Sequence, residues 1–262
     1  MSQHLELVHG LYAQPTPLGA FRAAEGTEHD AVSQLLRVLL LHPTTPRLDA
    51  DTLARWFAST PDDALRVVQA AQDHALVEGI TAPRTISGGS LEQVLPALLP
   101  ALSSEGRALL VDAQGFVAGA SGFAPEAAEA LAALSADLGI LHERHRRHFP
   151  TSIGLPTSAW ALVDGAGNSE VGFWPLHIGD EHFVLTIGGI PRLHQQAFTD
   201  LIGVLMLRYG APTRVPVAPV AVAAAAPAPT TPAVTNVPSP PVATASGLTV
   251  RPSTNRLEGA HP

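Results

Sequence analysis

The sequence predicts an α+β protein in which a small helical domain precedes a domain of strands and helices, with a disordered tail at the end. Three observations indicate this organisation. Apolar residues recur at helical spacing between residues 28 and 82, and short apolar segments alternate with turns between residues 90 and 210. The aromatic residues end at Tyr209.

Residues 1–27 have the weakest pattern. Leu5, Leu7 and Leu11 alternate loosely, and the sequence from Gln14 to Pro17 is typical of a turn. We therefore expect two short extended pieces here.

Residues 28–82 are expected to form three helices and a strand. Thr27, Asp49 and Thr60 each provide a side-chain oxygen that can cap a helix, and Pro61 suits the first helical position. Residues 76–80 form the predicted strand. Helix, helix, tight turn, helix and strand is the order of a winged-helix domain, which this part of the chain resembles.

Winged-helix domains often contact DNA through the third of these helices. Here that helix carries one basic residue, Arg66, against three aspartates. Because neutralised phosphates supply much of the affinity for DNA, we expect this domain to pack or to contact protein rather than DNA.

Ser90 begins the second domain. With Gln93 it matches a capping box, and the helix that follows should be kinked or shortened by Pro96 and Pro100. A β-hairpin comes next, because strands at 108–112 and 116–120 flank a turn that contains Gly.

A long helix is predicted from Pro125 to about His148, followed by strands at 158–163, 170–178 and 182–188. A last helix should run from Pro191 to Gly210. The long helix has a leucine face and, about a quarter turn away, a face of small residues. These faces consist of Leu131, Leu134, Leu138 and Leu141, and of Ala128, Ala132, Ser135 and Gly139.

Residues 90–210 resemble the Roadblock (dynein light-chain) family, on the sequence ALLVDAQGFVAGASG, the alanine-rich helix after it and LHIGDEHFVLTIGG. The resemblance implies a Roadblock/profilin-like fold, a five-stranded antiparallel sheet with one long helix on one face and two on the other. It also implies homodimers or heterodimers, and it implies small Ras-like GTPases as partners, which prokaryotic members commonly bind or regulate.

Two features indicate how a homodimer would form. The small-residue face would let a second helix approach closely, and the apolar strand at 158–163 lies at the sheet edge in the strand order of the family, where it invites pairing. The predicted dimer interface contains Ala128, Ala132, Ser135, Gly139, Trp160 and Leu162.

Composition excludes several kinds of chemistry. Cysteine and lysine are both absent, which rules out disulfides, thiolate catalysis, Schiff-base lysines and the P-loop lysine. No nucleophile, base and orienting group can be read together, so we expect no enzymatic activity and no cofactor. A net charge of −8 does not favour polyanionic partners.

The N-terminus lacks the basic start and apolar core of a signal peptide, and no apolar run approaches the roughly 20 residues that a membrane span needs. We therefore expect a cytoplasmic protein that does not contact membranes.

Two groups of histidines could bind a metal. His142, His145 and His148 lie near the end of the long helix, but three interleaved arginines repel a cation. His177 and His182 flank the last hairpin turn, where they could bind zinc with nearby carboxylates, although a solvated turn explains the same residues. We assign no metal to either group.

Residues 211–262 are rich in Pro, Ala, Thr and Val. Such a segment buries too little apolar surface to offset the entropy of ordering, which predicts a disordered tail.

The sequence thus favours a non-enzymatic, dimeric protein-interaction module. The alternative is a DNA-associated or transcription-regulatory protein that uses the winged helix.

Overall fold

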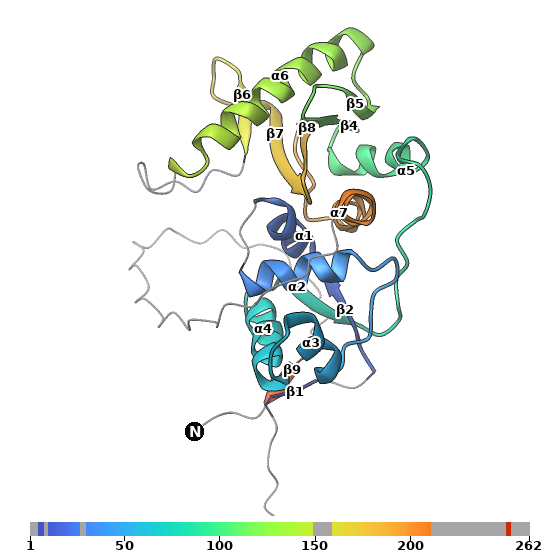
Figure 1. Cartoon of the computed structure of the whole chain (residues 1–262). Coiled ribbons are helices and arrows are strands. Elements are labelled where there is room, and N and C mark those ends of the chain that lie inside the picture. The colour runs from blue at the N-terminus through green and yellow to red at the C-terminus, as the bar shows by residue number, and fades with distance from the viewer. Residues whose placement is uncertain (1–4, 8–9, 27–29, 149–158, 211–249, 253–262) are drawn as a thin grey trace, which may run out of the picture.

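A computed structural model of the chain describes residues 5–7, 10–26, 30–148, 159–210 and 250–252 (Figure 1). The N-terminal part contains β1 (Leu5–Leu7), β2 (Tyr12–Pro15), α1 (Pro17–Ala24), α2 (Ala31–Leu40), α3 (Ala50–Phe57), α4 (Pro61–Asp73) and β3 (Val77–Ile80). The second part contains α5 (Leu91–Leu98), the 3₁₀ helix η1 (Leu99–Leu102), β4 (Arg107–Asp112), β5 (Val117–Ser121), α6 (Pro125–His145), β6 (Trp160–Val163), β7 (Ser169–Ile178), β8 (Glu181–Gly188) and α7 (Gln196–Tyr209). A last strand, β9 (Val250–Pro252), pairs with β1.

Short polar side chains determine where the N-terminal helices begin. Asp49 and Thr60 cap α3 and α4 as predicted, each by accepting a hydrogen bond from a backbone N–H three residues later. Asp30 caps α2 in the role predicted for Thr27, which lies outside the described residues. Thr16 caps α1, a helix that was not predicted in the segment expected to be extended.

The winged helix is not confirmed. The strand after its third helix, β3, would have to pair with a strand that follows it in sequence. Instead, β3 pairs antiparallel with β2, which precedes all of the helices, so that Tyr12 lies opposite Ile80 and Pro15 opposite Val77. The N-terminal part is therefore a group of four helices closed by a two-stranded sheet.

The second part contains the predicted five-stranded antiparallel sheet, with the strand order β5-β4-β8-β7-β6. Its element order agrees with the prediction over residues 90–210. Alternate residues of β4 face opposite sides: Leu109 and Val111 pack with residues of α6, while Ala108 and Leu110 belong to the larger core on the other side.

Helices cover both faces of this sheet. The long helix α6 lies on one face, and α5 and α7 lie on the other (Figure 1). Helix α7 is buried on nearly all sides, because α1 and α2 pack against the surface that it turns away from the sheet. The buried core is therefore continuous from the N-terminal helices to the sheet.

Prolines explain where two helices differ from the prediction. The capping box at Ser90 is present, since its backbone N–H donates to Oε1 of Gln93 at 3.0 Å, but the helix ends at Leu98 and continues as the 3₁₀ helix η1. The last helix begins at Gln196 rather than at Pro191, which lies in an isolated bridge with Ser103.

The predicted tail, residues 211–262, lies outside the described residues except for β9. Those three residues differ from the prediction, because they form a strand. Among the described helices, none is both long and apolar enough to cross a membrane.

Candidate functional site

The small-residue face of α6 packs against its own sheet. Ala128 and Ala132 are buried against Leu109 and Val111, and the side chain of Ser135 has no exposed surface. These three residues were predicted to contact a second protomer, and within one chain they are buried. The physical reason is that small side chains let α6 approach its own sheet as closely as they would let it approach a second helix.

The other three predicted interface residues differ in exposure. Gly139 is half-buried, and a Cβ added there would lie 3.4 Å from Cγ2 of Val184. Trp160 is also half-buried, and its indole N–H donates to Nδ1 of His142 at 3.3 Å. Leu162 alone is exposed, at 44%.

An apolar surface does exist beside α6, but most of its residues are not among the six predicted for the dimer interface. Strand β6 is an edge strand that pairs only with β7 among the described strands. Leu162 and Val163 of β6 are exposed at 44% and 60%, and Leu141 of α6 at 36%. Trp160 of β6 donates a hydrogen bond to His142 of α6, so the C-terminal end of α6 lies beside β6. We call Leu141, Leu162, Val163 and the open edge of β6 the β6–α6 surface.

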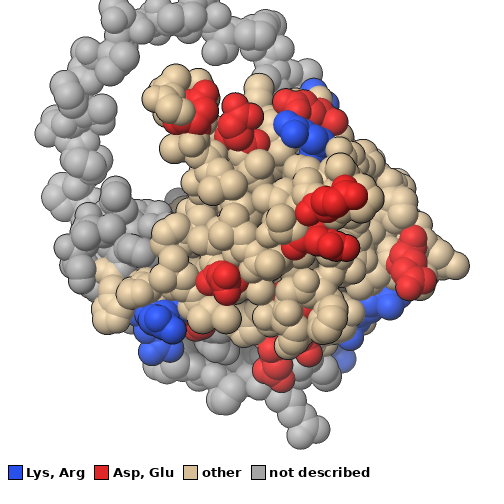
Figure 2. All heavy atoms as spheres, turned by 90° about the horizontal axis from the view of Figure 1, so that it is seen from above, with Lys and Arg blue, Asp and Glu red and all other residues tan. Residues whose placement is uncertain are grey.

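Charge is sparse on the side of the molecule where α6 lies. Figure 2 views this side from above and shows acidic side chains scattered over a largely uncharged surface, with basic side chains near its edge. A protein partner suits such a surface better than a nucleic acid does, because nucleic acids need clustered positive charge.

A cavity of about 380 Å³ lies between the C-terminal half of α6 and strands β7 and β8. Its lining includes His142 and Glu143 from α6, His177 from β7 and His182 from β8. The structure thus brings one histidine of the first predicted group together with both of the second. His145 and His148, the rest of the first group, are not among the lining residues.

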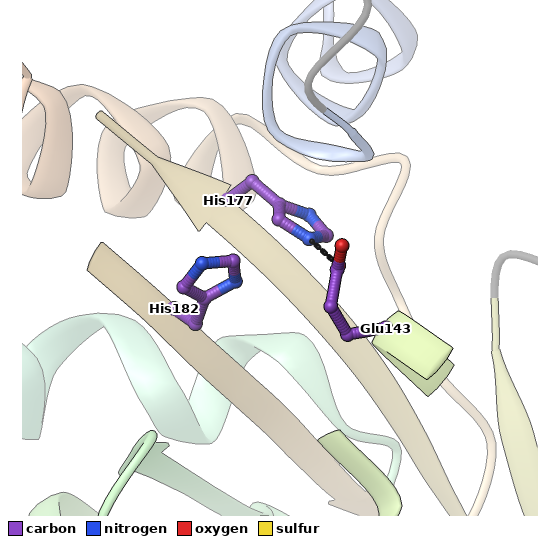
Figure 3. A group of neighbouring side chains, drawn as sticks. All are labelled: Glu143, His177 and His182. Carbon is purple, nitrogen blue, oxygen red and sulfur yellow. Dashed lines mark hydrogen bonds and ion pairs between the residues drawn. The ribbon is translucent and has the colours of Figure 1, made fainter. Parts of the chain in front are cut away.

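Three of these side chains converge closely (Figure 3). Nε2 of His177 lies 3.1 Å from Oε2 of Glu143, and the rings of His177 and His182 meet edge to face with their centroids 4.7 Å apart. One potential ligand atom from each of Glu143, His177 and His182 lies within 4.8 Å of the other two. His177 is only 5% exposed, and its Nδ1 has no hydrogen-bond partner among the described atoms.

Burial keeps the two inner histidines neutral. It lowers the pKa of His142 to about 4, helped by the neighbouring His177. Burial also lowers the pKa of His177, although the hydrogen bond with Glu143 acts in the opposite direction. For Glu143, burial acts to raise the pKa, but hydrogen bonds from Arg146 and His177 outweigh it and hold the pKa below its usual value.

The fold, the open edge and the cavity define an α+β protein with a five-stranded antiparallel sheet, an apolar edge strand and a small, mostly apolar cavity that contains three histidines and a glutamate. No protein-family model and no curated protein matches the chain. Solved structures that are similar to this chain over 46–48% of its length include the following three.

One of these structures is a Roadblock/LC7 domain from Streptomyces avermitilis, with 16% identity over 96% of that chain and a TM-score of 0.33. The others are the gliding protein MglB from Thermus thermophilus, with 18% identity, 93% coverage and a TM-score of 0.31, and MglB from Myxococcus xanthus, with 11%, 92% and 0.29.

The sequence does not indicate that Glu143 is a neighbour of His177. The residues are 34 positions apart, and each lies beside a more conspicuous feature, the arginines of α6 or the hairpin turn. Leu141 belongs to the leucine face predicted for the helix, and it is the one exposed residue of that face, since Leu131, Leu134 and Leu138 are half-buried.

Proposed function

We propose that this protein is a non-enzymatic interaction module that forms a homodimer through the β6–α6 surface. The observation that carries the proposal is the apolar edge of β6, which has no partner strand on its outer side among the described residues. Open edges that expose apolar side chains pair readily with another strand. A five-stranded sheet with one long helix on one face, as in this chain, is also the arrangement for which the Roadblock resemblance implied dimers.

A second copy of the chain fits this surface better than an unrelated strand. Two β6 edges related by a two-fold axis would pair antiparallel, and each α6 would lie beside its symmetry mate. The opposite face of the sheet is not available, because α5 and α7 cover it and α1 and α2 cover α7. The β6–α6 surface, in contrast, is open to a partner.

Light scattering of the full chain, combined with the Leu162→Glu substitution, tests the dimer. We expect the wild type to be a dimer at tens of micromolar, a concentration at which an interface of standard size is populated. Leu162→Glu places a charge on the exposed strand and should yield a folded monomer. Leu18→Glu is the matched control, since Leu18 is exposed at 56% on α1, away from β6. A monomeric wild type would contradict the proposal.

We further propose a small Ras-like GTPase as the partner of the dimer. This part is supported by the Roadblock-type arrangement of the sheet and by the weakly charged surface around α6. The test is a pull-down in which the full chain captures proteins from native cell lysate. The lysate contains either a GTP analogue or GDP, and mass spectrometry identifies the captured proteins. Recovery of a GTPase in only one nucleotide state supports the proposal, and recovery of none contradicts it.

No observation favours the alternative of DNA binding. Arg66 is the one basic residue of α4, and its guanidinium is paired with Asp63 at 2.8 Å. A helix whose only cation is already neutralised in this way offers little to a phosphate backbone.

A further inference from the structure

We propose that Glu143, His177 and His182 bind a divalent transition-metal ion of the zinc type at the edge of the cavity between α6, β7 and β8. The three side chains come from two segments distant in sequence, the end of α6 and the β7–β8 hairpin (Figure 3). Two imidazoles and one carboxylate form a ligand set that suits zinc, with the fourth position left to water.

The spacing of the ligand atoms is close to what such an ion requires. Zinc bonds of about 2.0–2.2 Å place tetrahedral ligands roughly 3.3–3.6 Å apart. Nε2 of His177 lies 3.1 Å from Oε2 of Glu143, and one ligand atom from each of the three residues lies within 4.8 Å of the other two. Glu143 and His182 are exposed, so rotation of their side chains can close the remaining gap.

The ring of His177 also has an unsatisfied polar atom. His177 is 5% exposed, yet one of its ring nitrogens has no partner among the described atoms. A neutral imidazole has one N–H and one lone pair, and a buried ring that leaves one of them unsatisfied is destabilised. The unpartnered atom is Nδ1, whereas Nε2 is the nitrogen beside Glu143, so an ion held by Nε2 would leave Nδ1 to a water molecule.

The positive charges of nearby arginines lower the affinity of the site for a metal ion but do not block the site. Nε of Arg146 lies 2.9 Å from both carboxylate oxygens of Glu143, and Arg144 lines the cavity. A carboxylate has about four lone-pair positions, so Glu143 can accept the hydrogen bond from Arg146 and still bind an ion. Asp112, which also lines the cavity, partly offsets the arginines.

A bound ion would join the end of α6 to the last hairpin beside the β6–α6 surface.

The test is a titration of the full chain, purified without a polyhistidine tag and stripped with chelator, with Zn²⁺ by calorimetry and with Co²⁺ by visible absorption. We expect one ion per chain. His182→Gln and Glu143→Gln should each weaken binding by more than about tenfold. Circular dichroism checks that each variant is folded. If His182→Gln does not fold, Glu143→Gln still provides the test.

Two control variants separate this site from adventitious binding. His194→Gln removes an exposed histidine outside the cluster, and His148→Gln removes a member of the helix-end group. Both should bind as the wild type does. The proposal is overturned if the wild type binds no more tightly than His182→Gln and Glu143→Gln, or if His148→Gln is the variant that loses the ion. The monomeric state expected of Leu162→Glu should leave metal binding intact, so the two proposals can fail separately.

Discussion

The hydroxyl of Ser135 on α6 lies 2.9 Å from the hydroxyl of Thr186 on β8, and neither side chain is exposed. Ser135 also donates to the carbonyl oxygen of Leu131 at 2.6 Å, so its proton is used and Thr186 must be the donor between the two hydroxyls. This short chain of hydrogen bonds fixes which face of α6 meets the sheet.

Ser135→Ala should lower the free energy of unfolding by about 1–3 kcal/mol, because the buried hydroxyl of Thr186 loses its acceptor. Adding Thr186→Val removes the unsatisfied group, so the double variant should lose less than the sum of the two single variants. Urea unfolding followed by circular dichroism measures all three. Strict additivity would show that the two hydroxyls are not coupled.

Ala132→Arg should unfold or strongly destabilise the chain, by about 3–5 kcal/mol, because it places a cation in the apolar layer between α6 and β4. Ala133→Arg is the matched control, since Ala133 is the next residue of the same helix and is exposed. Thermal melts compare the two variants. A stable, folded Ala132→Arg would mean that the small-residue face is open to solvent after all.

Stability should depend on the charge of Asp30 at low pH. Burial acts to raise the pKa of this carboxyl, but hydrogen bonds from the side chain and backbone of Ser33, together with the charge of Arg22, hold it below the ordinary value of 3.8. A carboxyl with a lowered pKa stabilises the folded state above that ordinary value, and this contribution is lost as the pH falls through the folded pKa.

Asp30→Asn keeps an acceptor for the cap of α2 but does not titrate. The free energy of unfolding of the wild type should exceed that of this variant by the full amount at neutral pH, and the difference should shrink below pH 3.8. Urea unfolding at a series of pH values measures it, and Asp30→Ser, a second uncharged cap, should behave in the same way. A gap that does not change with pH would exclude the charge of Asp30 as its cause.

Gly19→Ala should destabilise the N-terminal part by about 2–3 kcal/mol. A Cβ at this position would lie 2.0 Å from the backbone carbonyl oxygen of Leu76, which cannot move aside as a flexible side chain could. Gly88→Ala is the control, because no atom lies within 4 Å of its added Cβ. Equal stability of the two variants in urea would show that α1 does not pack closely on the chain before β3.

Local signals made much of the fold predictable. Asp49, Thr60 and Ser90 each begin a helix where the cap pattern placed it, because such caps depend only on residues within one turn. The same pattern at Thr16, followed by Pro17, was available for α1 but was interpreted as a turn.

Contacts between segments distant in sequence were harder to predict. The small residues of α6 indicate close packing but not against what, so the sequence alone did not distinguish the sheet of the same chain from a second protomer. Likewise, neither the histidines of the hairpin nor Glu143 reveals the other, because 34 residues separate Glu143 from His177 and only the folded sheet brings them together.

The burial of α7 between the sheet and the N-terminal helices has a consequence for synthesis on the ribosome. Helices α1 and α2 emerge first, yet the surface that they pack against is made more than 150 residues later. Until α7 has left the exit tunnel, these helices can pack on each other, on β2 and on α4, but the surface that they turn toward α7 has no partner. The N-terminal helices can therefore complete their packing only late in translation, after the sheet and α7 have been made.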